Sequence, residues 1–114
     1  MDTNTDFQKQ VVLVTGGTKG IGKGIAQAFL AAGATVVVCG RQQPEELPAA
    51  AGRTAEFIAC DVREAAAVKE LVDEVQRRHG RLDVLINNAG GAPNADAATV
   101  SPRFHESVLR LNLF

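Results

Sequence analysis

The chain has 114 residues, of which 46% are hydrophobic and 4% aromatic, and its formal charge at pH 7 is −1. This length allows no more than one domain. The near-neutral charge excludes electrostatic attraction of nucleic acid. The polar segment 1–10 excludes a secretory signal or membrane span at that end. We predict a cytoplasmic protein with a polar tail over 1–10, one domain over 11–114, and neither nucleic acid nor membrane as a partner.

Four short β-prone runs follow one another along the chain, and three of them are nearly unbroken in apolar residues. Such runs are typical of strands that are buried on both faces of a sheet. Because helical patterns separate them, we expect parallel strands joined by right-handed crossovers. The predicted fold class is α/β, a Rossmann-type doubly wound parallel sheet that ends after the fourth strand and the helix that follows it. The predicted strands are 11–15, 35–39, 56–60 and 83–87.

Helices are predicted between these strands. In the first interval, Ile21, Ile25 and Phe29 recur at helical spacing, Gly24 would let the helix approach the sheet, and Gly33 supplies a C-terminal stop. Ser101-Pro102 is typical of the start of a later helix, whereas 42–52 and 91–99 are predicted to be irregular. An amphipathic helix is predicted around 68–75, with i,i+4 ion pairs on its exposed face between Asp73 and Arg77 and between Glu74 and Arg78.

The cysteines and histidines show no spacing typical of a metal or redox site. Cys39 and Cys60 each fall near the end of a predicted strand, and we interpret them as small buried hydrophobic residues. His79 and His105 fall on predicted helix surfaces, where we expect them to be solvated. The sequence therefore predicts no metal site.

A glycine-rich turn over 15–22 directly follows the first apolar strand, with the spacing Gly-x-x-x-Gly-x-Gly. Glycines let backbone N–H groups at the start of the next helix approach a pyrophosphate closely. Two other interpretations are compatible with this turn. Gly17 to Gly22 followed by Lys23 imitates a P-loop, although Gly24 stands where that motif needs Ser or Thr for magnesium. A structural turn without a ligand is the second alternative.

Each of the four predicted strands ends in residues with distinctive chemistry. In open parallel sheets, ligands bind beyond the carboxyl ends of the strands, so a ligand site is predicted at this edge. The four ends are Thr15-Gly16, Gly40-Arg41, Asp61-Val62 and Asn87-Asn88-Ala89-Gly90.

In this arrangement the chain resembles the short-chain dehydrogenase/reductase family, whose members show Thr-Gly-x-x-x-Gly-x-Gly, an Asp after the third strand and Asn-Asn-Ala-Gly after the fourth. A further family Asn lies in the next helix, and Asn112 occupies that place. The resemblance covers almost the whole chain after the tail. It implies a nicotinamide coenzyme on the glycine turn, held by Thr15, Gly16, Thr18, Lys19, Gly20, Ile21 and Gly22.

The resemblance also implies roles for the other matching residues. Asp61 would hydrogen-bond the adenine amino group, and Val62 would touch the ring. Asn88, Ala89 and Gly90 would line the ribose side of the coenzyme. The Asn112 backbone carbonyl would hold a water of a catalytic proton relay.

Structural alternatives exist for three of these residues. Asp61 with Glu64 also forms a fair capping box for the following helix. Asn88, with the preceding Asn, could simply make a turn, because Asn tolerates left-handed conformations. Asn112 shares a predicted helix face with Val108 and could be an ordinary core amide satisfied by neighbouring backbone.

The end of the second strand indicates the coenzyme. NAD-selecting folds place a carboxylate there to bond the ribose hydroxyls, whereas this chain has Gly40-Arg41 and no carboxylate before Glu45. Arg41 and Lys19 could both reach a 2′-phosphate, as in NADP-preferring members of the family. We therefore predict NADP(H) over NAD(H); the alternative is that both are solvated surface cations.

The catalytic Ser and Tyr-x-x-x-Lys pair of the family are absent, because the chain has no Tyr and its last Lys is Lys69. We expect an N-terminal fragment that is inactive and poorly soluble alone, with an unpaired outer edge on its fourth strand. The full-length protein is expected to be a homo-oligomeric, NADP-dependent oxidoreductase that acts on a small carbonyl or secondary alcohol. The alternative is a non-catalytic nucleotide-binding or interaction protein on the same half-fold.

Overall fold

The computed structural model describes residues 7–88 and the backbone of 107–110. Its elements alternate strand and helix, apart from a short hairpin between the second and third long strands. In chain order they are β1 (Val11–Thr15), α1 (Gly20–Ala31), β2 (Thr35–Gly40), β3 (Ala49–Ala50), β4 (Arg53–Thr54), β5 (Glu56–Ala59), α2 (Ala65–His79), β6 (Val84–Asn87) and β7 (Ser107–Arg110).

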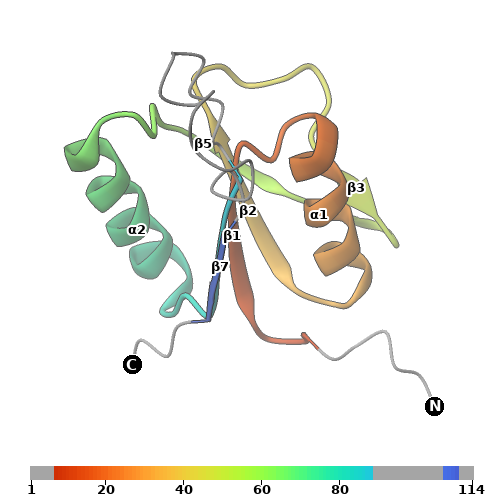
Figure 1. Ribbon diagram of the computed structural model, residues 1–114. Helices are drawn as coiled ribbons and strands as arrows, with labels where there is room; N and C mark the ends of the chain where they lie inside the picture. Colours follow the sequence, from red (N-terminus) through yellow and green to blue (C-terminus); the bar gives the residue numbers. More distant parts are fainter. Residues whose placement is uncertain (1–6, 89–106, 111–114) are drawn as a thin grey trace.

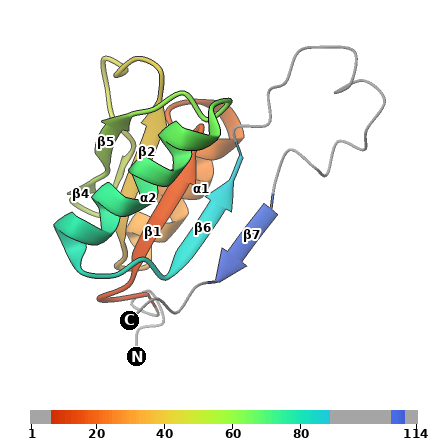
Figure 2. The ribbon, with the colours of Figure 1, turned by 90° about the vertical axis from the view of Figure 1, so that its left-hand side faces the viewer.

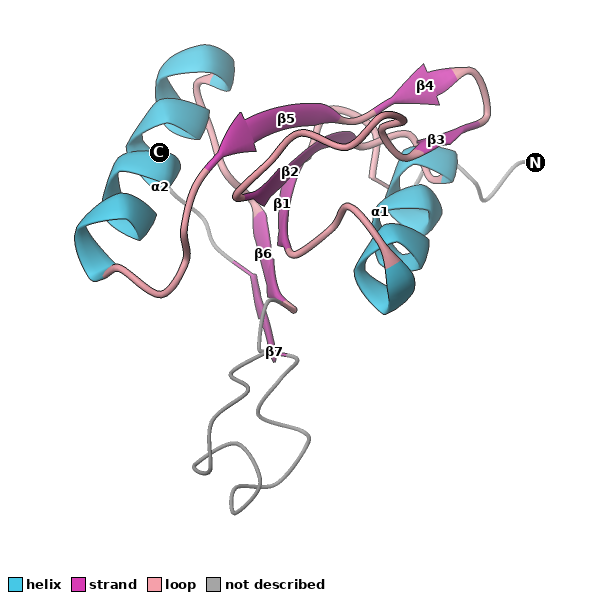
Figure 3. Cartoon of the chain, turned by 90° about the horizontal axis from the view of Figure 1, so that it is seen from above, coloured by secondary structure: helices cyan, strands magenta, loops and turns pink. Residues whose placement is uncertain are grey.

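The main sheet has the order β5-β2-β1-β6-β7, and its first four strands are parallel. Helices α1 and α2 lie on opposite sides of this sheet, as Figure 1 and the view from above in Figure 3 show. Parallel strands with helices on both faces confirm the predicted Rossmann-type α/β fold. The four predicted strands are the four parallel strands, with bounds that differ by at most one residue.

The apolar strand runs supply two cores, one on each face of the sheet. In β1, Val12 and Val14 pack with α1, whereas Leu13 packs with α2; alternate residues of β2 divide in the same way. Cys39 and Cys60 are free, buried thiols of the α2-side core, as predicted. Burial raises the pKa of the Cys39 thiol to about 12, so it stays protonated at neutral pH.

Helix α1 keeps its expected stop but not its expected contact with the sheet. The chain turns after it at Gly33, whose φ is +97°. Gly24, however, is exposed, and a Cβ placed there would meet no atom within 4 Å. It is Ala26 and Leu30 that bury this helix against the sheet, because they lie on the inward side of the same helical repeat.

Strand β7 replaces part of the helix predicted from Ser101-Pro102. Residues 107–110 form an antiparallel strand beside β6, with Val108 opposite Ile86 (Figure 2). The prediction that Val108 and Asn112 share a helix face is therefore wrong for Val108, which lies in a strand. The prediction of an unpaired outer edge on the fourth strand is also wrong, because β6 pairs with β7. Pairing satisfies backbone groups of β6 that a helix would have left open, a non-local gain that outweighs local spacing. Residues 101–106 and Asn112 lie outside the described residues.

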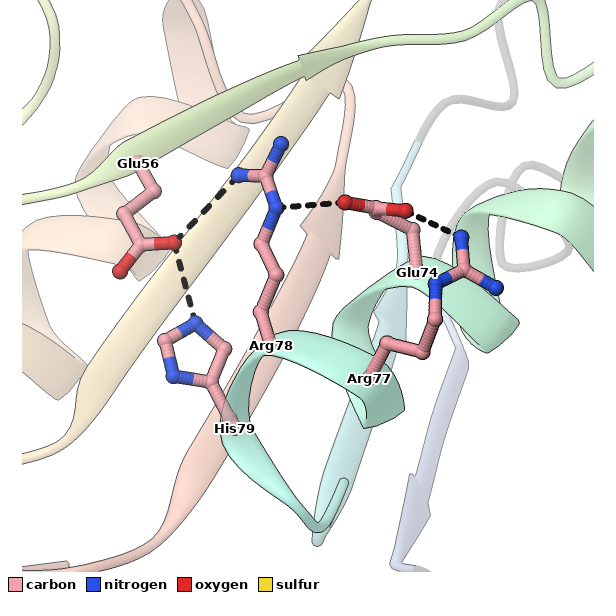
Figure 4. Close-up of polar contacts among 5 residues, drawn as sticks. All are labelled: Glu56, Glu74, Arg77, Arg78 and His79. Atoms are coloured by element: carbon pink, nitrogen blue, oxygen red, sulfur yellow. Dashed lines mark hydrogen bonds and ion pairs between the residues drawn. The ribbon is translucent and has the colours of Figure 1, made fainter.

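Of the two ion pairs predicted on α2, the pair between Glu74 and Arg78 is confirmed and the pair between Asp73 and Arg77 is wrong. Asp73 bonds Lys69 (Nζ–Oδ2 3.2 Å) rather than Arg77. Glu74 bonds both Arg77 and Arg78, as Figure 4 shows, with 2.7 Å between its Oε2 and the Arg78 Nε. Lys69 reaches Asp73 from the preceding turn, and Glu74 lies close enough to Arg77 at i,i+3 to compete for it.

His79 is not a solvated histidine. It ends α2, where its side chain is 19% exposed and its Nε2 lies 3.0 Å from the Glu56 Oε1 on β5. The Arg78 guanidinium reaches the same oxygen at 3.8 Å (Figure 4). Because the C-terminal turn of α2 lies beside the start of β5, a residue predicted to face solvent meets a carboxylate instead.

Candidate coenzyme site

The carboxyl ends of the parallel strands meet at one edge of the sheet, which we call the rim: residues 15–22, 40–44, 61–63 and 87–88. The register places Thr15 beside Cys39 on one side and beside Asn87 on the other. Gly40 lies opposite Ala59, and Ala59 comes two residues before Asp61 in the chain. The structure thus brings together the described residues of all four predicted strand ends.

Thr15 ties the ends of β1 and β6 together. Its side chain is buried, and its hydroxyl accepts the backbone N–H of Asn88 at 2.9 Å. The same hydroxyl lies 3.0 Å from the Asn87 Oδ1, to which it can donate. Since these contacts engage the Thr15 hydroxyl, its effect on a ligand is to fix the two loops relative to each other.

The glycine turn is packed too closely for side chains at two of its positions, Gly22 and Gly17; a Cβ on Gly17 would lie 2.6 Å from a Val38 methyl carbon. The Asn88 Nδ2 donates to the Gly16 carbonyl oxygen at 3.4 Å. A Cβ on Gly22 would collide with both of these atoms. Gly20, at the start of α1, has a φ of +62°, which also favours glycine. The turn can therefore present backbone N–H groups rather than side chains to a ligand.

The start of α1 is suited to an anion. Within the described residues of this helix and its cap, the cap residue Lys19 makes no side-chain capping bond and the first turn holds no acidic residue. Unpaired N–H groups and the helix dipole favour negative charge at such a terminus. Ile21 is 68% exposed on the same turn, an apolar side chain left uncovered at the rim.

A cavity of about 670 Å³ adjoins this turn at the end of β2. Lys19 and Arg41, both exposed, line it from different loops. Among its described lining residues there is no carboxylate, so its charged groups are both cations. The full lining is Thr18, Lys19, Gly40, Arg41, Gln42, Gln43 and Pro44.

Asp61 is held by Arg63, two residues further along the chain. The Arg63 Nε lies 2.9 Å from the Asp61 Oδ1, and the Arg63 Nη2 lies 2.8 Å from the Oδ2. Hydrogen bonds from the Arg63 side chain and backbone lower the pKa of Asp61 to about 2, and the charge of Arg41 acts in the same direction. Asp61 is therefore ionised throughout the physiological range.

The capping interpretation of Asp61 is wrong. Helix α2 begins at Ala65 after Glu64, which makes no side-chain capping bond. The Asp61 carboxylate instead accepts the backbone N–H of Arg63 at 3.0 Å, which closes a local turn. Val62, beside it, is half-buried against the α2-side core.

Two predicted coenzyme residues, Ala89 and Gly90, and the predicted catalytic residue Asn112 lie outside the described residues. Sequence reasoning missed Arg63, whose signal was an arginine two positions after a rim carboxylate. Groups of three or more metal-binding side chains are lacking among residues 7–88. The helices in the described part of the chain are all too short or too polar to cross a membrane.

Comparisons with known proteins agree with the fold described above. A family model described as short chain dehydrogenase matches residues 10–114. L-fucose dehydrogenase of Bos taurus is 41% identical over 99% of this chain and 43% of its own length. 3beta-hydroxysteroid dehydrogenase of Mediterraneibacter gnavus is 46% identical over 74% of this chain and 32% of its own length.

A solved structure, the Pseudomonas aeruginosa RhlG/NADP active-site complex, is similar with a TM-score of 0.70 and 34% identity, covering 88% of this chain and 42% of that one. The chain thus spans less than half the length of each of these three proteins. Because the family model covers nearly the whole chain, the chain belongs to the short chain dehydrogenase family.

Proposed function

We propose that the protein containing this chain is an NADP-dependent oxidoreductase that transfers hydride between the coenzyme and a small carbonyl or secondary alcohol. The observation that carries this proposal is the cavity at the end of β2, where Lys19 and Arg41 meet without a carboxylate among the described lining residues. When bound, NADP(H) supplies the hydride donor or acceptor.

The charge at this cavity favours a coenzyme with a 2′-phosphate. A charge-assisted hydrogen bond contributes roughly 1.5 to 3 kcal/mol, so either cation alone would favour NADPH about tenfold or more. NAD-selective sites use a carboxylate at this point, which would repel the phosphate. In this chain Gly40 occupies the end of β2, so that position carries no carboxylate.

The other rim residues fit the remaining parts of the same coenzyme. The pyrophosphate is assigned to the glycine turn and α1, with Thr15 fixing the turn and Ile21 uncovered beside it. Asp61 is assigned to the adenine amino group and Val62 to the ring. The ribose side is assigned to Asn88, Ala89 and Gly90, and the proton-relay water to the Asn112 carbonyl.

The resemblance to the family implies that a Ser and a Tyr-x-x-x-Lys pair transfer the proton to or from the substrate. This chain has no Tyr, and its last Lys, Lys69, lies on α2. We therefore assign the acid/base groups, and with them the substrate pocket, to parts of the protein beyond these 114 residues. The isolated chain is expected to bind coenzyme without turning over substrate, and the complete protein to be a homo-oligomer.

The decisive experiment titrates the full-length protein with NADPH and with NADH and follows the fluorescence of the reduced nicotinamide. We expect NADPH to bind at least about tenfold more tightly, because two cations face its phosphate. Arg41→Asp, which exchanges one of them for a carboxylate, should reverse this preference. Equal affinities for the two coenzymes in the unmodified protein would contradict the proposal.

A further inference from the structure

The acceptor positions of the Asp61 carboxylate are almost all occupied by Arg63. The Oδ1 accepts both the backbone N–H of Arg63 at 3.0 Å and its Nε at 2.9 Å. The Oδ2 accepts the Arg63 Nη2 at 2.8 Å. A carboxylate offers about four acceptor positions. Counting donors from the described part of the chain, one position therefore remains, and it is on the Oδ2.

This remaining position belongs to the rim. Asp61 follows β5, next to the end of β2 and its cavity. The positive charge of Arg41 contributes to the lowered pKa of its carboxyl group. The Asp61 side chain is 28% exposed and that of Arg63 is 66% exposed. A ligand lying along the rim can thus reach the carboxylate without displacing the guanidinium.

We propose that Arg63 is a positioning residue that sets the base selectivity of the coenzyme site, by holding the Asp61 carboxylate in one orientation with a single acceptor position left for the 6-amino group of adenine. This inference rests on the proposed function. A 6-amino purine donates to that acceptor. A 6-oxo purine would bring an oxygen lone pair against it, and buried or half-buried acceptors that face each other are unfavourable.

Arg63 also prevents the carboxyl group from adapting to the wrong base. A protonated carboxyl could donate to a 6-oxo oxygen and so accept hypoxanthine. A carboxyl group with the usual pKa of 3.8 is already ionised at neutral pH, and the guanidinium lowers the pKa of Asp61 to about 2, which makes protonation on binding the wrong base still less favourable. Fixing the direction of the Oδ2 has the same consequence, because the carboxylate cannot rotate to accommodate another edge of the base.

The test compares NADPH with its deamino analogue, reduced nicotinamide hypoxanthine dinucleotide phosphate, in which a 6-oxo group and an N1–H replace the 6-amino group and the unprotonated N1 of adenine. Both are titrated into the full-length protein by nicotinamide fluorescence, so no catalytic turnover is needed. We expect the unmodified protein to prefer NADPH about tenfold or more. In Arg63→Gln this ratio should fall by about threefold, since exposed ion pairs have modest effects.

A matched control and a rescue variant separate selectivity from general stability. Arg77→Gln removes an equally exposed arginine (68%) from an ion pair with Glu74 at the far end of α2, and the ratio should not change. Arg63→Lys keeps the cation and should restore most of the ratio. If Arg63→Gln does not fold, Arg63→Met, which removes the cation at a similar side-chain length, takes its place: the inference predicts a lower ratio in this variant, whereas a purely structural role predicts equal weakening of both coenzymes and an unchanged ratio.

Three results would overturn the inference, and they are distinguishable. An unmodified protein that binds both analogues equally would show that Asp61 does not select the base. Variants of Arg63 that weaken both analogues by the same factor would show that Arg63 only stabilises the loop. Absence of any binding of NADPH would refute the proposed function itself, and this inference with it.

Discussion

Hydrogen bonds between a side chain and the backbone join β1 and β6 at both of their ends, but the surroundings of the two ends differ. At the amino ends, the Asp83 carboxylate accepts the Val11 N–H at 2.8 Å, and the Asp83 N–H donates to the Val11 oxygen at 2.9 Å. The Arg81 guanidinium closes the outer side of Asp83 at 2.7 Å. At this end, polar groups satisfy one another.

At the carboxyl ends, Thr15 joins the strands in the same way, but the groups around it remain open. Lys19 and Arg41 are exposed, Ile21 is uncovered, and a Cβ on Gly20 would meet no atom within 4 Å. We propose that the amino ends of these strands serve stability and that the carboxyl ends serve ligand binding. Substitutions at the two ends should therefore have separable effects.

The largest expected effect is on coenzyme binding, from Gly22→Ala. Its Cβ would collide with the Gly16 oxygen and the Asn88 amide, so the turn must move. A displacement of about 1 Å at a site of this kind costs about a hundredfold, here expected in the Kd for NADPH. Gly24→Ala, two residues further on in α1, is the matched control, because its Cβ would meet nothing within 4 Å. Unchanged binding in Gly22→Ala would contradict a phosphate site at this turn.

At the opposite end, Asp83→Ala should lower the free energy of unfolding by about 2 kcal/mol, because it leaves the buried Val11 N–H without its side-chain acceptor. Urea unfolding of the full-length protein measures this. Asp83→Asn retains an acceptor oxygen and should be less destabilising. The ratio of NADPH to NADH affinity should stay constant in both variants. A change in that ratio would break the separation between the two ends.

A smaller effect, about tenfold in the Kd for NADPH, is expected from Gly40→Asp, which adds a carboxylate beside the proposed phosphate. The substitution is sterically compatible, since the nearest atoms to a Cβ there are 3.8 Å and 3.9 Å away. NADH binding should be unchanged or improved. Gly40→Ala adds the Cβ without charge and should leave NADPH binding unaltered; equal losses in both variants would point to crowding rather than charge.

The parts of this fold that follow from local pattern could be predicted from the sequence. The unbroken apolar strands, the helix around Ile25 and the stop at Gly33 depend on neighbouring residues. Strand β7 and the His79–Glu56 contact could not, because each depends on a partner 20 or more residues away. Their energies come from tertiary pairing, which local periodicity does not report.

The site, like the fold, has one part that could be predicted from the sequence and one part that could not. Order and spacing of the strand ends predicted the rim, since the carboxyl ends of parallel strands must share an edge. The partner of Asp61 could not be predicted, because a capping box and a local bond to Arg63 are both compatible with the sequence. The choice depends on where α2 begins, and it begins at Ala65, too late for Asp61 to cap it. Ala89, Gly90 and Asn112 stay predictions.

The smallest effect we expect is a pH dependence that arises at the rim. The pKa of Asp61 is about 2 in the folded protein, against a usual value of 3.8, because Arg63 bonds its anionic form. A depressed carboxyl pKa stabilises the folded state fully above the usual value, and this stabilisation is lost as the pH falls toward the folded value. The urea midpoint of the unmodified protein should therefore exceed that of Arg63→Gln near neutrality, and the gap should narrow as the pH falls below about 4. A gap that stays constant down to the lowest pH at which the protein folds would mean that Arg63 stabilises this loop by packing and not through the Asp61 carboxylate.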